Sequence, residues 1–120
     1  MTALTPRMDI PKGTLDLMIL KALSAGASHG YGLAKWIHST TDGALEIDDG
    51  ALYPALHRLE ARGWIGAEWG VSDNNRRARY YALRAEGRRR LQVEVSSWTR
   101  FAAAMTKIID AGVPAAGSAR

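Results

Sequence analysis

The apolar pattern near the C-terminal end constrains the fold of this chain most strongly. Over residues 85–109, apolar side chains follow one another in alternating steps of four and three: Leu91, Val95, Trp98, Ala102, Met105 and Ile109. This spacing predicts one helix with a coiled-coil seam. A helix of that size is about 37 Å long, which is more than a domain built from this short chain can cover. We therefore predict that these six residues form the interface of a homodimer.

Trp98 lies in the middle of that seam, and two interpretations of it remain open. The one we favour makes it a core residue of the dimer. In the other, the flat apolar face of the indole stacks on a small hydrophobic or aromatic effector.

Two shorter helices are predicted nearer the N-terminus. The first begins at residues 12–14 and ends before Gly26, which we expect to supply a left-handed cap. Ser28 is expected to cap the second helix, over residues 30–39. A short strand is expected at residues 45–47, where apolar and polar side chains alternate. The inward face of the second helix is expected to comprise Leu33, Trp36 and Ile37.

A third helix is predicted from Asp48 and Asp49, which suit a helix N-terminus, to about Arg62, before Gly63. Its buried stripe is expected to be Leu52, Leu56 and Leu59. At about 100° per residue, the opposite face then carries Pro54, His57, Arg58 and Ala61. Such a face has two readings: an ordinary amphipathic surface, or a compact face that approaches a DNA groove and lets Arg58 contact a guanine or a phosphate.

Two strands are predicted next, at residues 64–71 and 79–83, joined by a link at 72–77 that is rich in turn-forming residues. Three helices followed by a hairpin are typical of the winged helix-turn-helix. The predicted fold is therefore mainly α with a small β-hairpin. We divide the chain into a flexible arm (1–11), a winged-helix DNA-binding domain (12–84), a dimerisation helix (85–109) and a disordered tail (110–120).

The charge of the chain is concentrated in one segment. The net charge is only +4, yet residues 76–90 contain seven arginines and one acid. At the predicted hairpin tip, Arg76, Arg77 and Arg79 fall within four residues. Guanidinium groups pair with phosphate through parallel hydrogen bonds, so we predict phosphate contacts here, against the alternative of a solvated arginine-rich face.

Other classes of function find little support in the sequence. The chain has no cysteine, and its three histidines show no metal-ligand spacing. No nucleophile turn or dinucleotide-binding loop is present. We therefore expect no enzyme activity, no cofactor and no metal. No apolar run is long enough to span a membrane and no secretion signal is visible, so the expected location is the cytoplasm.

Four segments closely resemble the PadR family of bacterial transcription regulators, and the likeness extends over about residues 12–109. They are 12–17 (Lys-Gly-Thr-Leu-Asp-Leu), 29–32 (His-Gly-Tyr-Gly), 52–60 (Leu-Tyr-Pro-Ala-Leu-His-Arg-Leu-Glu) and 79–83 (Arg-Tyr-Tyr-Ala-Leu). A single C-terminal helix is similar to the short subclass of that family. Ala51 and Arg84 depart from the family pattern, which often has Ser or Thr at the first position and Thr at the second.

The resemblance implies a homodimeric winged-helix repressor, with a small-molecule inducer lodged near the dimer interface. It further implies that the third helix reads the major groove and that the wing touches flanking DNA. By position, the implied DNA contacts are Tyr53, His57, Arg58, Arg76 and Arg77, together with Tyr31 and Lys35.

The leading hypothesis is a dimeric, sequence-specific regulator of transcription that binds a pseudo-palindromic operator in double-stranded DNA. Two alternatives stay open. One is a ligand sensor in which the effector site around Trp98 sets the biological role. The other is a protein-interaction module on a winged-helix scaffold with little affinity for DNA.

Overall fold

A computed structural model describes residues 13–114 of the chain. The predicted arm at 1–11 lies outside these residues, as does the part of the predicted tail at 115–120. Helices and strands follow in this order: α1 (Thr14–Leu23), β1 (Ser28–His29), α2 (Gly30–Thr40), α3 (Asp49–Ala61), β2 (Ile65–Val71), β3 (Arg77–Leu83) and α4 (Ala85–Asp110).

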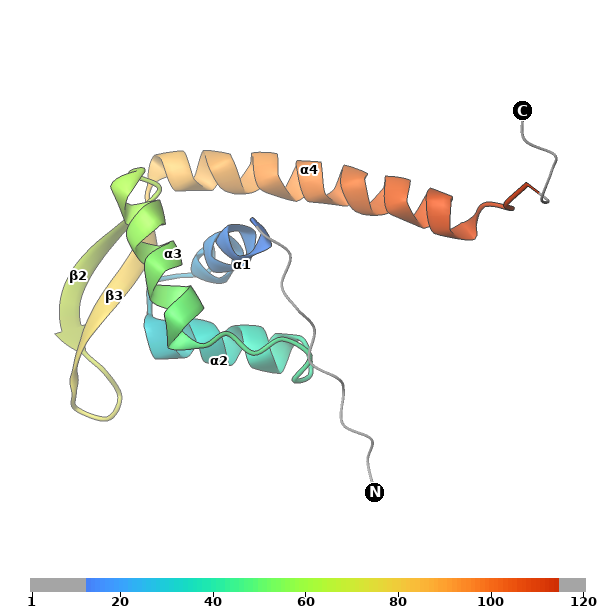
Figure 1. The fold of residues 1–120 in the computed structure, drawn as a ribbon. Coiled ribbons are helices and arrows are strands. Elements are labelled where there is room, and N and C mark those ends of the chain that lie inside the picture. Colours follow the sequence, from blue (N-terminus) through green and yellow to red (C-terminus); the bar gives the residue numbers. More distant parts are fainter. Residues whose placement is uncertain (1–12, 115–120) are drawn as a thin grey trace, which may run out of the picture.

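Figure 1 shows two parts of different shape. Helices α1, α2 and α3 cluster beside the β2–β3 hairpin, and α4 starts next to that hairpin and runs well past the cluster. The described sheet has three antiparallel strands in the order β1-β3-β2. Its main ladder runs from the pair Ile65–Leu83 to the pair Val71–Arg77. We call residues 13–84 the body and, within it, β2–β3 with its turn the wing.

The core of the body is aliphatic and lies where the three helices meet the sheet. Among residues 13–114, Tyr81 is the only buried residue whose side chain carries a polar group. The predicted stripe of α3 is confirmed, since Leu52, Leu56 and Leu59 are all buried. The other large side chains that are almost fully buried are Ile19, Leu20, Leu23, Leu33, Ile37, Ile65 and Tyr81.

The start of α2 differs from the prediction. The cap is His29 rather than Ser28, because the imidazole Nδ1 accepts the Gly32 N–H at 3.0 Å. Ser28 and His29 instead form a third strand, which pairs with Tyr81 and Tyr80 on the free edge of β3.

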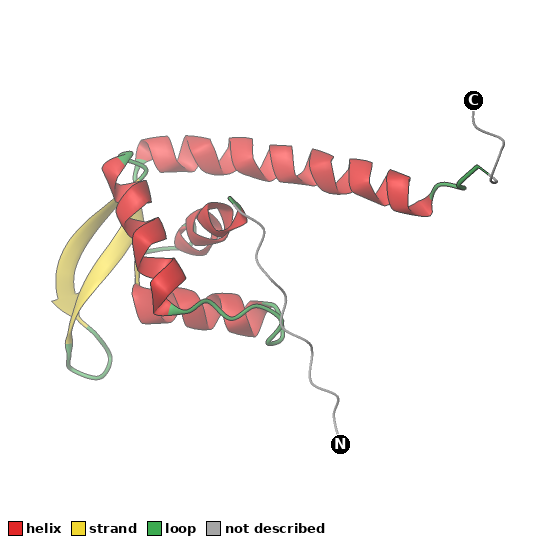
Figure 2. Cartoon of the chain, in the orientation of Figure 1, coloured by secondary structure: helices red, strands yellow, loops and turns green. Residues whose placement is uncertain are grey.

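Three further expectations about the helices and loops are wrong. Trp36 does not face inward and is 42% exposed. Residues 45–47 form no strand and belong to the loop between α2 and α3 (Figure 2). There, the Leu45 N–H is bonded to the hydroxyl of Thr41 at 3.1 Å, so it has a partner outside any sheet. Gly26 has φ of 155°, outside the left-handed helical region, and α1 already ends at Leu23.

Helix α4 matches its predicted bounds to within one residue, but its only buried residue is Gly87. A Cβ at Gly87 would lie 2.0 Å from the Trp64 carbonyl oxygen, so glycine is what lets α4 approach the backbone just before β2 this closely. Leu91 packs against the core of the body. Beyond it the large apolar side chains are exposed: Val95, Trp98, Phe101, Met105, Ile108 and Ile109. No helix within residues 13–114 is long and apolar enough to cross a bilayer.

Candidate nucleic-acid interface

A groove of about 1130 Å³ lies between the start of α2, the exposed side of α3 and the wing. It brings together residues that the sequence places up to 54 positions apart, from Ala27 to Tyr81. Seven of the eight predicted DNA-binding residues line it: Tyr31, Lys35, Tyr53, His57, Arg76, Arg77 and Arg79. Arg58 does not.

The glycines of the His-Gly-Tyr-Gly segment allow α2 and α3 to meet closely at this groove. A Cβ on Gly30 would lie 2.6 Å from the Tyr53 hydroxyl, so the ring of Tyr53 lies against bare backbone. A Cβ on Gly32 would come equally close to the Ser28 hydroxyl. Tyr31, between them, is 72% exposed. The motif therefore fixes Tyr53 of α3 against α2 and leaves Tyr31 open to a partner.

The wing is fixed to the same corner by aromatic contacts. The ring of Tyr80 meets the ring of His29 edge to face, with 5.3 Å between centroids. Tyr80 also covers Gly70, where a Cβ would lie 2.9 Å from its ring, and its hydroxyl donates to the Val71 carbonyl at 3.1 Å. The wing and the α2 corner are thus held in a defined relative position.

Tyr81 lies beneath the groove and is almost fully buried. Burial raises the pKa of its hydroxyl above the ordinary value, and the nearby Arg79 guanidinium opposes this only in part. The group is therefore neutral at ordinary pH, and it adds no negative charge where an anionic partner would lie.

The cations of the groove differ in how far they are already engaged. Arg79 forms an ion pair with Glu60 at 2.7 Å. Lys35, Arg76 and Arg77 form no ion pair within residues 13–114, and Asp73 is the only acid in the groove lining. The charge of the groove is therefore positive. It comes mainly from Arg76 and Arg77 at the tip of the wing and from Lys35 of α2.

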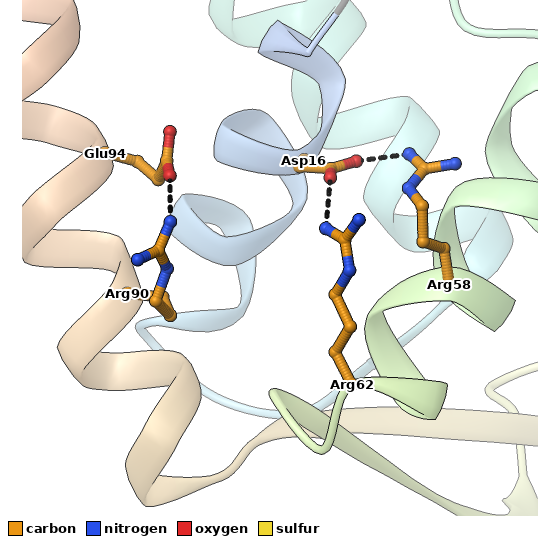
Figure 3. Close-up of polar contacts among 5 residues, drawn as sticks. All are labelled: Asp16, Arg58, Arg62, Arg90 and Glu94. Carbon is orange, nitrogen blue, oxygen red and sulfur yellow. Dashed lines mark hydrogen bonds and ion pairs between the residues drawn. The ribbon is translucent and has the colours of Figure 1, made fainter.

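Arg58 extends from α3 toward α1, where it meets an acidic partner (Figure 3). Its guanidinium lies 2.5 Å from the Asp16 carboxylate, which also pairs with Arg62 at 3.7 Å. A DNA contact by Arg58, as the resemblance implies, would require that pair to break. The sequence alone does not reveal this ion pair, because Asp16 and Arg58 lie 42 residues apart.

Trp69 lines the groove but was missed as a site residue. The sequence predicted only that Trp69 lies in the strand at residues 64–71. Its position in the sequence could have marked Trp69 as a site residue. It lies near the wing turn, where a two-stranded hairpin extends beyond the helices.

Three helices, a hairpin wing beside them and a cationic groove between helices and wing define a class of protein. The class is that of the winged-helix, DNA-binding transcription regulators. Residues 19–93 match the model of the "Transcriptional regulator PadR-like family". This match spans more than half of the chain, and the chain belongs to the PadR-like family of transcriptional regulators. Members of this family are transcription factors rather than enzymes.

Individual relatives agree with this assignment. An uncharacterised protein of Lysinibacillus sphaericus is 33% identical over 105 residues, which cover 87% of this chain and 92% of the relative. A transcriptional regulator from Clostridium thermocellum is 30% identical, with a TM-score of 0.77 over 86% of this chain and all of that one. A PadR family regulator from Eggerthella lenta is 29% identical, with a TM-score of 0.69 over 84% of this chain and 86% of that one.

Proposed function

We propose that this protein is a dimeric repressor that binds a pseudo-palindromic operator and is released by a small-molecule effector. The observation that carries the DNA-binding part is the groove. It places the exposed side of α3 beside three cations that have no ion pair within residues 13–114: Lys35, Arg76 and Arg77. We expect the protein to act in the cytoplasm, in contact with the DNA it regulates.

In this proposal α3 enters the major groove, which is wide enough for a helix, and presents Tyr53 and His57. The turn of the wing then lies along the neighbouring backbone, where Arg76 and Arg77 bind phosphates. Contacts to phosphate position a protein on DNA, whereas contacts to base edges select the sequence. Specificity is therefore assigned to α3 and most of the salt dependence to the wing.

Dimerisation is assigned to α4. Exposed apolar side chains that run along a helix at heptad spacing are expected to pair with a second copy. A two-fold axis along α4 would present two reading helices to successive major grooves, about 34 Å apart. The operator is then expected to contain two inverted half-sites.

The effector is assigned to the exposed aromatic pair on α4. The rings of Trp98 and Phe101 lie 5.9 Å apart and are tilted by 35°, and both side chains are exposed. A small hydrophobic or aromatic compound that inserts at this seam would change how the two copies of α4 pack. The spacing of the two reading helices would change with it, and affinity for the operator would fall. This same pair supports the alternative in which ligand sensing is the main role.

Binding to the DNA upstream of the protein's own gene, compared with random duplex, tests the repressor proposal. Fluorescence anisotropy should show tighter binding to the upstream fragment, and native mass spectrometry should show a dimer. A stable monomer, or equally weak binding to both fragments, would contradict it and favour the protein-interaction module.

Planar aromatic compounds should quench Trp98 fluorescence and weaken operator binding. Trp98→Ala should abolish both responses, whereas Trp36→Phe should leave both in place because Trp36 lies outside α4. Quenching that survives Trp98→Ala would place the effector elsewhere.

A further inference from the structure

Trp69 is a large apolar side chain in an unusual position. The ladder places it opposite Arg79, on the same face of β2 as the buried Ile65. Yet Trp69 is 60% exposed, and Val71, the next residue on that face, is 65% exposed. The outer half of the wing therefore continues the apolar face of the inner half, and residues 13–114 leave most of it uncovered.

A single exposed apolar residue is ordinary on a protein surface. What distinguishes Trp69 is its surroundings. The guanidinium carbon of Arg77 lies 4.4 Å from the centroid of its ring. Both residues line the groove together with Arg76 and Lys35, so the exposed indole shares the groove with three cations.

This contact leaves both partners able to bind. A guanidinium that stacks on a ring uses its flat face, and its hydrogen-bond donors point outward in the plane of the group. The contact with the ring also restricts Arg77 to few rotamers, so less side-chain entropy is lost when it binds. The exposed part of the indole remains available for an apolar contact.

A DNA strand offers a matching surface. Along its backbone, charged phosphates alternate with deoxyribose rings, whose exposed edges are largely apolar. An indole beside a guanidinium presents the same two chemistries next to each other. A neutral apolar partner would match the indole but leave three cations without a counter-charge, so the charge of the groove favours DNA as the occupant.

We propose that Trp69 is a DNA-contacting residue, which packs on a deoxyribose of the flanking backbone while Arg77 binds an adjacent phosphate. This inference rests on the proposed DNA-binding function and deepens it by adding an apolar contact that does not read the sequence. The contact should raise affinity for every duplex alike.

Affinity measurements separate this contact from a charge effect. Trp69→Ala should weaken binding about tenfold, which corresponds to about 1.4 kcal/mol, on the operator and on random duplex alike. The dependence of log K on log salt should stay as in the wild type, because no charge is removed. Arg77→Ala should weaken binding and also reduce the slope by about 0.9 for each phosphate that the guanidinium no longer neutralises.

Fluorescence then locates the contact. In free protein, acrylamide should quench Trp69 readily, and DNA should protect it. The protection seen with wild-type protein should be largely lost in Trp69→Phe and retained in Trp36→Phe, a matched control whose tryptophan is exposed but does not line the groove. Both variants replace one aromatic ring by another, so the fold should persist even where Trp69→Ala destabilises it.

The outcomes distinguish the inference from the function on which it rests. If Trp69→Ala binds DNA as tightly as the wild type and Trp69→Phe keeps the full protection, the inference is overturned while DNA binding stands. If Trp69→Ala converts the dimer to a monomer, the indole is covered by a second copy and the inference is also wrong. If the wild type binds no DNA, the proposed function fails, and the inference with it.

Discussion

The body and α4 use apolar side chains in opposite ways. In the body, the large apolar residues of the helices turn inward and are almost completely buried. In α4, the apolar residues beyond Leu91 keep the same helical regularity, yet most of them are exposed. A regular apolar stripe thus predicts only that one face of a helix packs against a partner. Whether the partner is the same chain or another molecule depends on where the helix ends in space (Figure 1).

A substitution in the core of the body should have the largest effect. Leu56 is fully buried, and Leu56→Ala should lower the free energy of unfolding by about 2–5 kcal/mol, because it removes apolar contacts and leaves a cavity. Urea unfolding followed by circular dichroism measures this change. The matched control Val113→Ala, at an exposed residue, should change the value by less than about 0.5 kcal/mol. Similar decreases for both variants would contradict the assignment of Leu56 to the core of the body.

Substitutions in α4 should affect assembly instead. The double variant Trp98→Ser, Phe101→Ser should shift the native mass from dimer to monomer, because it removes two large apolar side chains from the proposed interface. Arg100→Ser is the matched control, since position 100 lies on the side of the helix opposite Trp98. A dimer that survives the double variant would mean that another surface joins the two copies.

A third variant tests the junction of the two regions. Arg84 is the N-cap of α4, and its side chain makes no capping hydrogen bond. Arg84→Thr should raise the free energy of unfolding by about 1 kcal/mol, because a hydroxyl can accept a free N–H of the first turn. Thermal unfolding checks this. An unchanged or lower melting temperature would show that the packing of Arg84 over Gly66 outweighs the missing cap.

The smallest effect is expected at the ion pairs between α1 and α3. Asp16→Asn should lower the free energy of unfolding by at most about 1 kcal/mol. The Asp16 side chain is only 14% exposed, but those of Arg58 and Arg62 are 44% and 48% exposed, so solvent screens both pairs from the arginine side. Urea unfolding at low and high salt measures it. A decrease of about 3 kcal/mol or more would indicate a desolvated pair, of the kind whose disruption strongly destabilises a protein.

Most of the fold could be predicted from the sequence because its helices have regular apolar faces and clear ends. The period of Leu52, Leu56 and Leu59 predicted α3, and the seam predicted α4 almost to the residue. Strand β1 could not be predicted, because a strand of two residues exists only through its pairing with β3. For the same reason the loop at 45–47 was misread as a strand, since local alternation does not reveal whether a partner strand is in reach.

The candidate site was predictable in its members but not in their orientation. The family motifs pointed to Tyr31 and Tyr53, which the fold brings to one groove. The motifs could not indicate that Arg79 pairs with Glu60 or that Trp69 is exposed. Both features depend on how the wing lies against the helices of the body.

The salt dependence of DNA binding tests the central claim most directly, that the turn of the wing binds phosphates. Removing four arginines from a dimer with Arg76→Ala and Arg77→Ala should reduce the slope of log K against log salt by about 3.6, at about 0.9 for each phosphate that an arginine neutralises. The control is Arg88→Ala with Arg89→Ala, which removes the same charge from α4 outside the groove. It should leave the slope close to that of the wild type. An unchanged slope in the wing variant, or an equal reduction in the control, would contradict the account.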